Sequence, residues 1–323
     1  MQAGFYYSFK ALKNMERDTH YFNGVRLALI AAVISGFSVY INKFGISFWA
    51  NSDSYTTAKN VIAAVFLTAV LVLWQKAEEL KGLSRRTWLA LFTIGFVGGS
   101  IPFLLFFKAL TLIPASEAAF VHKTLFLWIA LFSYPFLRER IGATQIAALG
   151  VLFGGIFLLG APKQWVFGTG FLLALGATLL WAIENIIAKR VLETVPAIIV
   201  GWARMFFGSL ILIGWVAVSG ELGSLVPASL TQTFWAFVVG AVLFGYVSAW
   251  YTALKHVPAT VASSVLTLAA PITTILEGIL IRSAFPTEII VPLAIMIFGI
   301  ALLVIQFRRI MRGLDQKNAP AYS

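Results

Sequence analysis

Ten apolar runs, each about as long as a bilayer is thick, constrain this chain more than any other feature. A helix needs about 20 apolar residues to cross the hydrocarbon core of a membrane. Of the 323 residues, 60% are apolar and 11% are charged, so no water-soluble core could bury the apolar surface. The sequence predicts an all-α integral membrane protein with ten transmembrane helices, at residues 27–49, 54–74, 88–110, 114–137, 141–161, 168–188, 196–218, 233–254, 258–281 and 286–307.

The composition also excludes several kinds of chemistry. The chain has no cysteine, which removes thiolate metal sites and thiol catalysis, and it has no Gly-Lys-Ser/Thr phosphate loop. A net charge of +11 is typical of nucleic-acid binders, but in a membrane chain it indicates basic loops on the cytoplasmic side. We expect no cofactor, no metal and no nucleic acid, and we expect a small-molecule substrate and membrane lipids as partners.

The distribution of basic residues predicts the orientation in the membrane. With both termini inside, seventeen of the 24 Lys and Arg residues fall on the cytoplasmic side, against five on the outer side. This bias follows the positive-inside rule. We therefore expect a multi-pass protein of the cell membrane, the inner membrane of a prokaryote, with loose polar cytoplasmic tails at 1–25 and 308–323.

The sequence contains the same five-helix unit twice. Residues 107–160 and 251–304, compared at an offset of 144, are identical at thirteen of 54 positions. Because five is odd, the unit 162–307 must enter the membrane inverted relative to the unit 26–161. Inverted repeats are typical of transporters that work by alternating access, with the substrate site near the midplane. Helices 1, 3, 4, 6, 8 and 9 should surround that site, and the apolar helices 5 and 10 should be peripheral.

Short motifs in the repeats resemble a known family. They are Ala109-Leu110, Pro114-Ala115, Leu137-Arg138-Glu139-Arg140, the glycine-rich stretch Gly150–Gly160, and then Ala253-Leu254, Pro258-Ala259 and Pro271. Over residues 25–307 the chain resembles the EamA branch of the drug/metabolite transporter superfamily. This resemblance implies a transporter of unspecified cargo, with a family-pattern cation in helices 2 and 7, here Lys59 and Arg204. The family's proline in helix 4 is absent near Leu127, and Glu139 corresponds to Ser283.

Polar residues in helices 1 and 6 form the first candidate site, because ionisable groups in a span are costly and face the bundle interior or water. One helix face carries Ser35, Ser38 and Asn42, and the equivalent face carries Trp181 and Glu184, with Asn185 beside them. Small polar residues also join helices in membranes. For Glu184 the alternatives are a role in substrate binding or proton coupling, or pairing with Lys189 or Arg190.

Helix 4 carries a second candidate group, His122 and Lys123, roughly 15 Å from the outer end at 1.5 Å per residue. Lys123 corresponds to Thr267, which shares a face with Ser263. We expect Lys123 to bind an anionic group of the substrate, the alternative being a buried pair with Glu184 or Glu117. His122 is either a proton shuttle or a partner for a neighbouring group.

The remaining candidate residues are not expected to bind the substrate. Lys59 and Arg204 are expected to be structural cations that hold carbonyls or a carboxylate at the repeat interface. Glu117 and Glu277 lie near outer helix ends and are expected to be solvated. Paired glycines such as Gly98-Gly99 indicate close helix approach or hinges.

The leading functional hypothesis is a secondary transporter of a small organic solute, an amino acid or related metabolite with an anionic group. Protons are the coupling ion considered, and a monomer is favoured over a dimer. The alternatives are a channel or lipid flippase on the same fold, and an intramembrane enzyme. The enzyme is disfavoured because only one of the three histidines lies deep in a span, without a well-placed acid.

Overall fold

The computed structural model describes residues 2–49, 51–162, 165 and 167–317, and within these ranges every regular element is helical. Ten helical segments are long and apolar enough to cross a membrane, which confirms the predicted number. We number them as spans 1 to 10 in chain order. The α-helices are α1 (Gln2–Ser47), α2 (Ser52–Leu73), α3 (Ala77–Lys81), α4 (Arg85–Gly99), α5 (Ile101–Leu110), α6 (Ala115–Lys123), α7 (Leu125–Phe136), α8 (Ala143–Gly160), α9 (Thr169–Val191), α10 (Ala197–Val218), α11 (Leu230–His256), α12 (Ala259–Leu266), α13 (Ala269–Leu280) and α14 (Ile290–Lys317). Two 3₁₀ turns, η1 (Leu222–Leu225) and η2 (Thr287–Ile289), precede α11 and α14.

Three spans are broken rather than continuous, which the apolar pattern did not predict. Span 3 consists of α4 and α5, span 4 of α6 and α7, and span 9 of α12 and α13. Spans 4 and 9 break at equivalent places, and in both a threonine hydroxyl donates to the carbonyl three residues earlier. Thr124 bonds to Val121 O at 2.6 Å and Thr267 to Ser264 O at 2.6 Å. Span 4 has no proline at this point, and the Thr124 hydroxyl competes for a carbonyl of the helix there.

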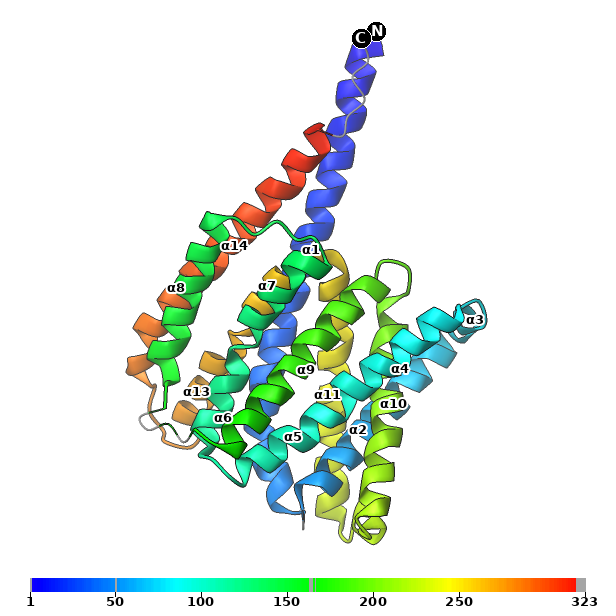
Figure 1. Ribbon diagram of the computed structural model, residues 1–323, viewed down its shortest axis with the longest axis vertical. Helices are drawn as coiled ribbons and strands as arrows, with labels where there is room; N and C mark the ends of the chain where they lie inside the picture. Colours follow the sequence, from blue (N-terminus) through cyan, green and yellow to red (C-terminus); the bar gives the residue numbers. More distant parts are fainter. Residues whose placement is uncertain (1, 50, 163–164, 166, 318–323) are drawn as a thin grey trace.

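The two ends of the chain differ from the predicted loose tails. Helix α1 begins at Gln2 and α14 continues to Lys317, and both project from the same side of the bundle (Figure 1). We call this side the terminal side and the opposite one the far side. Arg308 joins the two helices, donating to both Asp18 oxygens at 3.2 and 2.9 Å. Tyr21 donates to Val304 O at 2.8 Å. Residues 318–323 of the predicted tail lie outside the described residues.

The two repeats exchange their first helices. Span 1 (α1) packs on α11, α12 and α13 of the second repeat, and span 6 (α9) packs on α4, α5, α6 and α7 of the first. Helices α8 and α14 pack mainly on each other along one edge of the molecule (Figure 1), which confirms that helices 5 and 10 are peripheral. Their close approach depends on Gly155, where a Cβ would lie 2.6 Å from Met296 Cγ.

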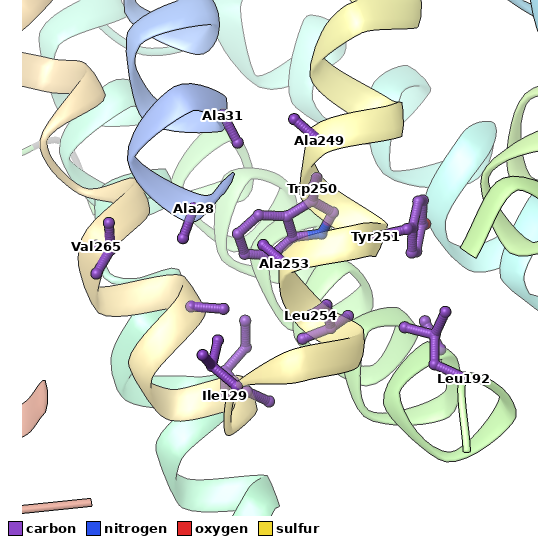
Figure 2. Close-up of a cluster of buried hydrophobic side chains, with 14 of the residues drawn as sticks. Ala28, Ala31, Ile129, Leu192, Ala249, Trp250, Tyr251, Ala253, Leu254 and Val265 are labelled. Carbon is purple, nitrogen blue, oxygen red and sulfur yellow. The ribbon is translucent and has the colours of Figure 1, made fainter. Parts of the chain in front are cut away.

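Small residues allow α1 and α11 to pack closely at the centre. Ala28 and Ala31 of α1 are fully buried and face Trp250 and Ala253 of α11 (Figure 2). A Cβ at Gly24 would lie 2.7 Å from Val257 Cγ1. Without a strong hydrophobic force between helices in lipid, such van der Waals contact is a main source of association. This packing fixes α11, which carries part of the candidate site.

A half-buried carboxylate joins the two repeats on the terminal side. Glu139, in the loop between α7 and α8, accepts hydrogen bonds from Ala259 N at 2.6 Å, Thr260 N at 3.3 Å and Thr260 Oγ1 at 2.7 Å. It thus satisfies free N–H groups at the first turn of α12. Burial raises the pKa of the Glu139 carboxyl above its ordinary value, although these donors act against the rise. The equivalent residue in the second repeat is Ser283, which has no carboxylate, so Glu139 of the first repeat has no equivalent carboxylate cap in the second.

Loss of this cap should destabilise the protein measurably. In Glu139→Ala the first turn of α12 loses its acceptor, and caps of this kind contribute about 0.5–2 kcal/mol. We expect a lower midpoint of thermal unfolding for the purified protein in detergent. Glu78→Ala is the matched control, because Glu78 is 82% exposed on α3. Equal midpoints for the two variants would contradict a stabilising role for Glu139.

Candidate functional site

The break in span 3 creates the centre of the site. Pro102 is the second residue of α5 and has no N–H, so the carbonyl four residues earlier, Gly98 O, loses its helical partner. In a bilayer that carbonyl must find another donor. Trp181 Nε1 of α9 donates to it at 3.1 Å, and Arg204 Nη2 of α10 donates at 3.2 Å. Two side chains of the second repeat therefore satisfy a backbone group of the first.

Glu184 lies directly beside this carbonyl. The side chain is fully buried, and Tyr251 OH donates to Glu184 Oε1 at 2.5 Å. Arg204 Nη1 lies 4.0 Å from Glu184 Oε2 and donates to Tyr251 OH at 3.4 Å. We call Gly98, Trp181, Glu184, Arg204 and Tyr251 the central network. Its acid and cation offset each other's charge in a medium where a lone charge would be very costly.

The central network is only partly satisfied. Glu184 Oε2 and Arg204 Nε are buried and have no hydrogen-bond partner among the described residues. His122 of α6 reaches the network through Trp181, with ring centroids 4.6 Å apart, and its Nδ1 is also buried without a partner. Buried polar atoms in folded proteins are nearly always paired, and here three incompletely paired atoms lie close together on three helices.

Asn185 has a structural position next to the network. Its Nδ2 donates to Trp181 O at 2.8 Å, and its Oδ1 accepts from Trp250 Nε1 at 3.0 Å. The amide thus joins α9 to α11. Both of its polar atoms are engaged, which separates Asn185 from the partly satisfied groups around Glu184.

A second polar cluster lies in the first repeat. Lys59 Nζ of α2 donates to Asn42 Oδ1 of α1 at 3.1 Å, and Tyr55 OH donates to the same oxygen at 2.9 Å. Asn42 Nδ2 donates to Ser38 O at 2.7 Å and to Ser38 Oγ at 3.1 Å. Lys59 Nζ also lies 5.3 Å from the centroid of the Tyr55 ring. We call Ser38, Asn42, Tyr55 and Lys59 the Lys59 cluster. Ser35 makes no hydrogen bond within the described part of the chain.

Several predicted site residues lie outside both groups. Ser263 donates to Ala259 O at 2.9 Å, and Thr267 bonds within its own helix, so both satisfy local backbone carbonyls. Lys123 Nζ lies 3.7 Å from where a Cβ on Gly160 of α8 would be, and it forms no hydrogen bond or ion pair with a described residue. Lys123 is therefore not paired with Glu184. Its role in binding the solute stays a prediction.

Two expectations for the charged residues are wrong. Glu184 is not paired with Lys189 or Arg190, because those side chains bind carbonyls at helix ends. Lys189 donates to Leu254 O at 2.6 Å, and Arg190 Nε donates to Phe136 O at 3.1 Å. Glu117 is fully buried rather than solvated. Glu277 is partly exposed and forms an ion pair with the exposed Lys43.

Two members of these groups, the Gly98 carbonyl and Tyr55, were not predicted from the sequence. Gly98 O was not foreseen, although Pro102 within an apolar run was the available signal. Gly98 is also required for space, because a Cβ there would collide with Glu184 Cγ and lie 2.9 Å from Glu184 Cδ. Tyr55 was missed, and nothing in its spacing distinguishes it from an interfacial aromatic residue.

Comparison with known proteins is consistent with this architecture. The sequence profile described as the EamA-like transporter family matches residues 22–161 and 168–305. An uncharacterized transporter of Clostridium kluyveri is 25% identical over 250 residues, covering 74% of this chain and 79% of the relative. One of Archaeoglobus fulgidus is 25% identical over 247 residues, covering 74% and 83%. A solved crystal structure shares the fold, with a TM-score of 0.70 at 18% identity, over 88% of this chain and 98% of the other.

The ten spans and two family matches define an integral, multi-pass membrane transporter. The chain belongs to the EamA-like transporter family, which confirms the resemblance seen in its sequence motifs.

The contact between Gly98 and Glu184 gives a direct test of the central network. Gly98→Ala should push the Glu184 side chain away from Arg204, and overpacking of this kind costs about 1–3 kcal/mol. We expect a lower thermal midpoint in detergent. The matched control is Gly154→Ala in α8, where a Cβ would meet nothing within 4 Å. That control should be neutral or stabilising, by up to about 1 kcal/mol. The same loss in both variants would show that Gly98 has no special role.

Proposed function

We propose that this chain is a secondary transporter that moves a small organic solute by alternating access, with Glu184 at its coupling site. The observation that carries the proposal is the buried Glu184 carboxylate where the two repeats meet, one oxygen of which accepts no hydrogen bond from a described residue and has only the distant Arg204 contact. In carriers built from inverted repeats, the substrate and ion sites lie at this interface. Membership in a transporter family favours transport over the intramembrane-enzyme alternative.

Contacts on the terminal side support an alternating mechanism. Glu139 of the first repeat binds the start of α12, and Arg190 of the second repeat binds Phe136 O of the first. These bonds join the repeats on one side of the central network, and they would have to break for a solute to leave on that side. The breaks in spans 4 and 9 supply places where half of a span can move relative to the other half.

Glu184 has the chemistry of a proton-coupling group. Arg204 favours its charged form, whereas burial favours its neutral form, so a small displacement of Arg204 would change its protonation. Breaking the contact of Arg204 with Gly98 O during a conformational change would cause such a displacement. Proton binding and the orientation of the carrier would then be linked.

We also propose a cargo, an orientation in the membrane and an oligomeric state. The cargo is an amino acid or related metabolite, and the transporter lies in the cell membrane with the terminal side in the cytoplasm. Seventeen Lys and Arg residues on that side, against five on the other, support this orientation. Ten spans can enclose a pathway within one chain, which favours a monomer.

The variant Glu184→Gln tests the coupling role. It keeps the shape of the side chain and removes the charge, so uptake driven by a pH gradient should be lost while solute exchange continues. The measurement is flux of a mixture of labelled amino acids in proteoliposomes, with and without the gradient. Glu277→Gln, on the far side, is the control and should retain gradient-driven uptake.

Two outcomes would contradict the proposal. If net flux in Glu184→Gln keeps the pH dependence of the parent, Glu184 is structural. If the parent shows flux that does not saturate and supports no counterflow, the protein is a channel and not a carrier.

A further inference from the structure

Both repeats carry a cation at equivalent positions, but the group beside the cation differs between them. In the second repeat Arg204 lies 4.0 Å from the Glu184 carboxylate. In the first repeat the equivalent cation is Lys59, and the residue equivalent to Glu184 is Ser38. Lys59 therefore has a carboxamide oxygen and a tyrosine ring for partners, and no carboxylate among the described residues.

This difference matters because Lys59 lies inside a span. It is seven residues into α2, which begins at Ser52, so its Cα is about 10 Å from the helix end at 1.5 Å per residue. A charged side chain at such a depth is costly unless it is paired, and unpaired cases mark substrate or ion pathways. No described residue places a carboxylate beside Lys59, so a bound anion would supply the missing counter-charge.

The Lys59 cluster is more exposed than the equivalent cation and acid of the second repeat. Arg204 and Glu184 are buried, whereas Lys59, Asn42 and Ser38 are each only half-buried. The Ser38 hydroxyl accepts from Asn42 Nδ2 and keeps its own proton, which it can donate to an anion beside the lysine.

We propose that the Lys59 cluster is the subsite that binds the carboxylate of the transported solute. Lys59 Nζ supplies the counter-charge, the Ser38 hydroxyl donates a hydrogen bond, and Asn42 holds the lysine and the serine in place. One lysine with neutral neighbours matches a monoanion, so a carboxylate fits better than a doubly charged phosphate. The inference rests on the proposed transport function and assigns the anion role to Lys59 in place of Lys123.

The test compares ligands that differ only in charge. The purified protein in detergent is heated with benzoate or its uncharged isostere benzamide, and with L-leucine or L-leucinamide. A ligand that binds the folded state raises the thermal midpoint by mass action. We expect the carboxylate member of at least one pair to raise the midpoint and the amide to have no effect. In Lys59→Met the apparent affinity for that carboxylate should fall at least about 30-fold, as for loss of a buried charge pair.

Control variants separate Lys59 from the other far-side lysines. Lys123→Met and Lys43→Met remove the same charge elsewhere and should keep the carboxylate-dependent shift. Asn42→Asp places a carboxylate beside Lys59, as Glu184 is placed beside Arg204. It should fold with a thermal midpoint at least equal to the parent's and show no carboxylate-dependent shift. This variant keeps the test decisive even if Lys59→Met does not fold.

Several results would overturn the proposal. One is a carboxylate-dependent rise of the thermal midpoint that survives in Asn42→Asp or Lys59→Met, or that is lost in Lys123→Met. Another is a larger rise of the midpoint with phenyl phosphate than with benzoate. The last is a parent protein whose midpoint does not rise with any of the carboxylates. Flux in proteoliposomes tests the transport function separately. Saturable exchange of an uncharged solute without a carboxylate shift would overturn the Lys59 subsite alone. A carboxylate shift without any saturable flux would overturn the transport function alone.

Discussion

The missing N–H of Pro102 is the constraint on which the centre of this protein depends. It leaves Gly98 O without a helical partner inside the membrane, where no water can replace one. Trp181 and Arg204 satisfy that carbonyl from the second repeat. Once Arg204 is held there, a carboxylate beside it is stabilised, and Glu184 occupies that place with Tyr251.

Glycine makes this arrangement sterically feasible. Gly98 leaves space for the Glu184 side chain, and Gly99 and Gly208 bring the α4 and α10 backbones together, since a Cβ at Gly208 would lie 2.6 Å from Gly99 O. The same close packing that stabilises the bundle also puts an ionisable pair at the repeat interface. Stability and function therefore draw on the same contacts, and a polar centre that is only partly satisfied is balanced by tightly packed helices around it.

Pseudo-symmetry gives the two repeats one architecture and different chemistry. Glu139 caps α12, whereas Ser283 stands at the equivalent place in the second repeat. Glu184 balances Arg204, whereas Lys59 has Asn42. In the alternating mechanism that we propose, two similar halves exchange conformations, and different interactions in each state bind and release the solute. These two differences would supply such interactions.

The number of spans and their approximate positions follow from the sequence alone, because each crossing of the bilayer needs a run of about 20 apolar residues. The two-copy organisation follows from the internal repeat, and an odd number of spans per copy inverts the second copy. Glu184, Arg204 and Lys59 were also found from sequence, since charges within apolar runs are conspicuous. The three helix breaks were not found, because a threonine or an early proline is compatible with a continuous span. The pairing of Glu184 with Arg204 and Tyr251, and of Lys59 with Asn42, was decided only by tertiary structure. Partners on separate helices depend on the rotation and depth of each helix, which packing determines and residue spacing does not encode.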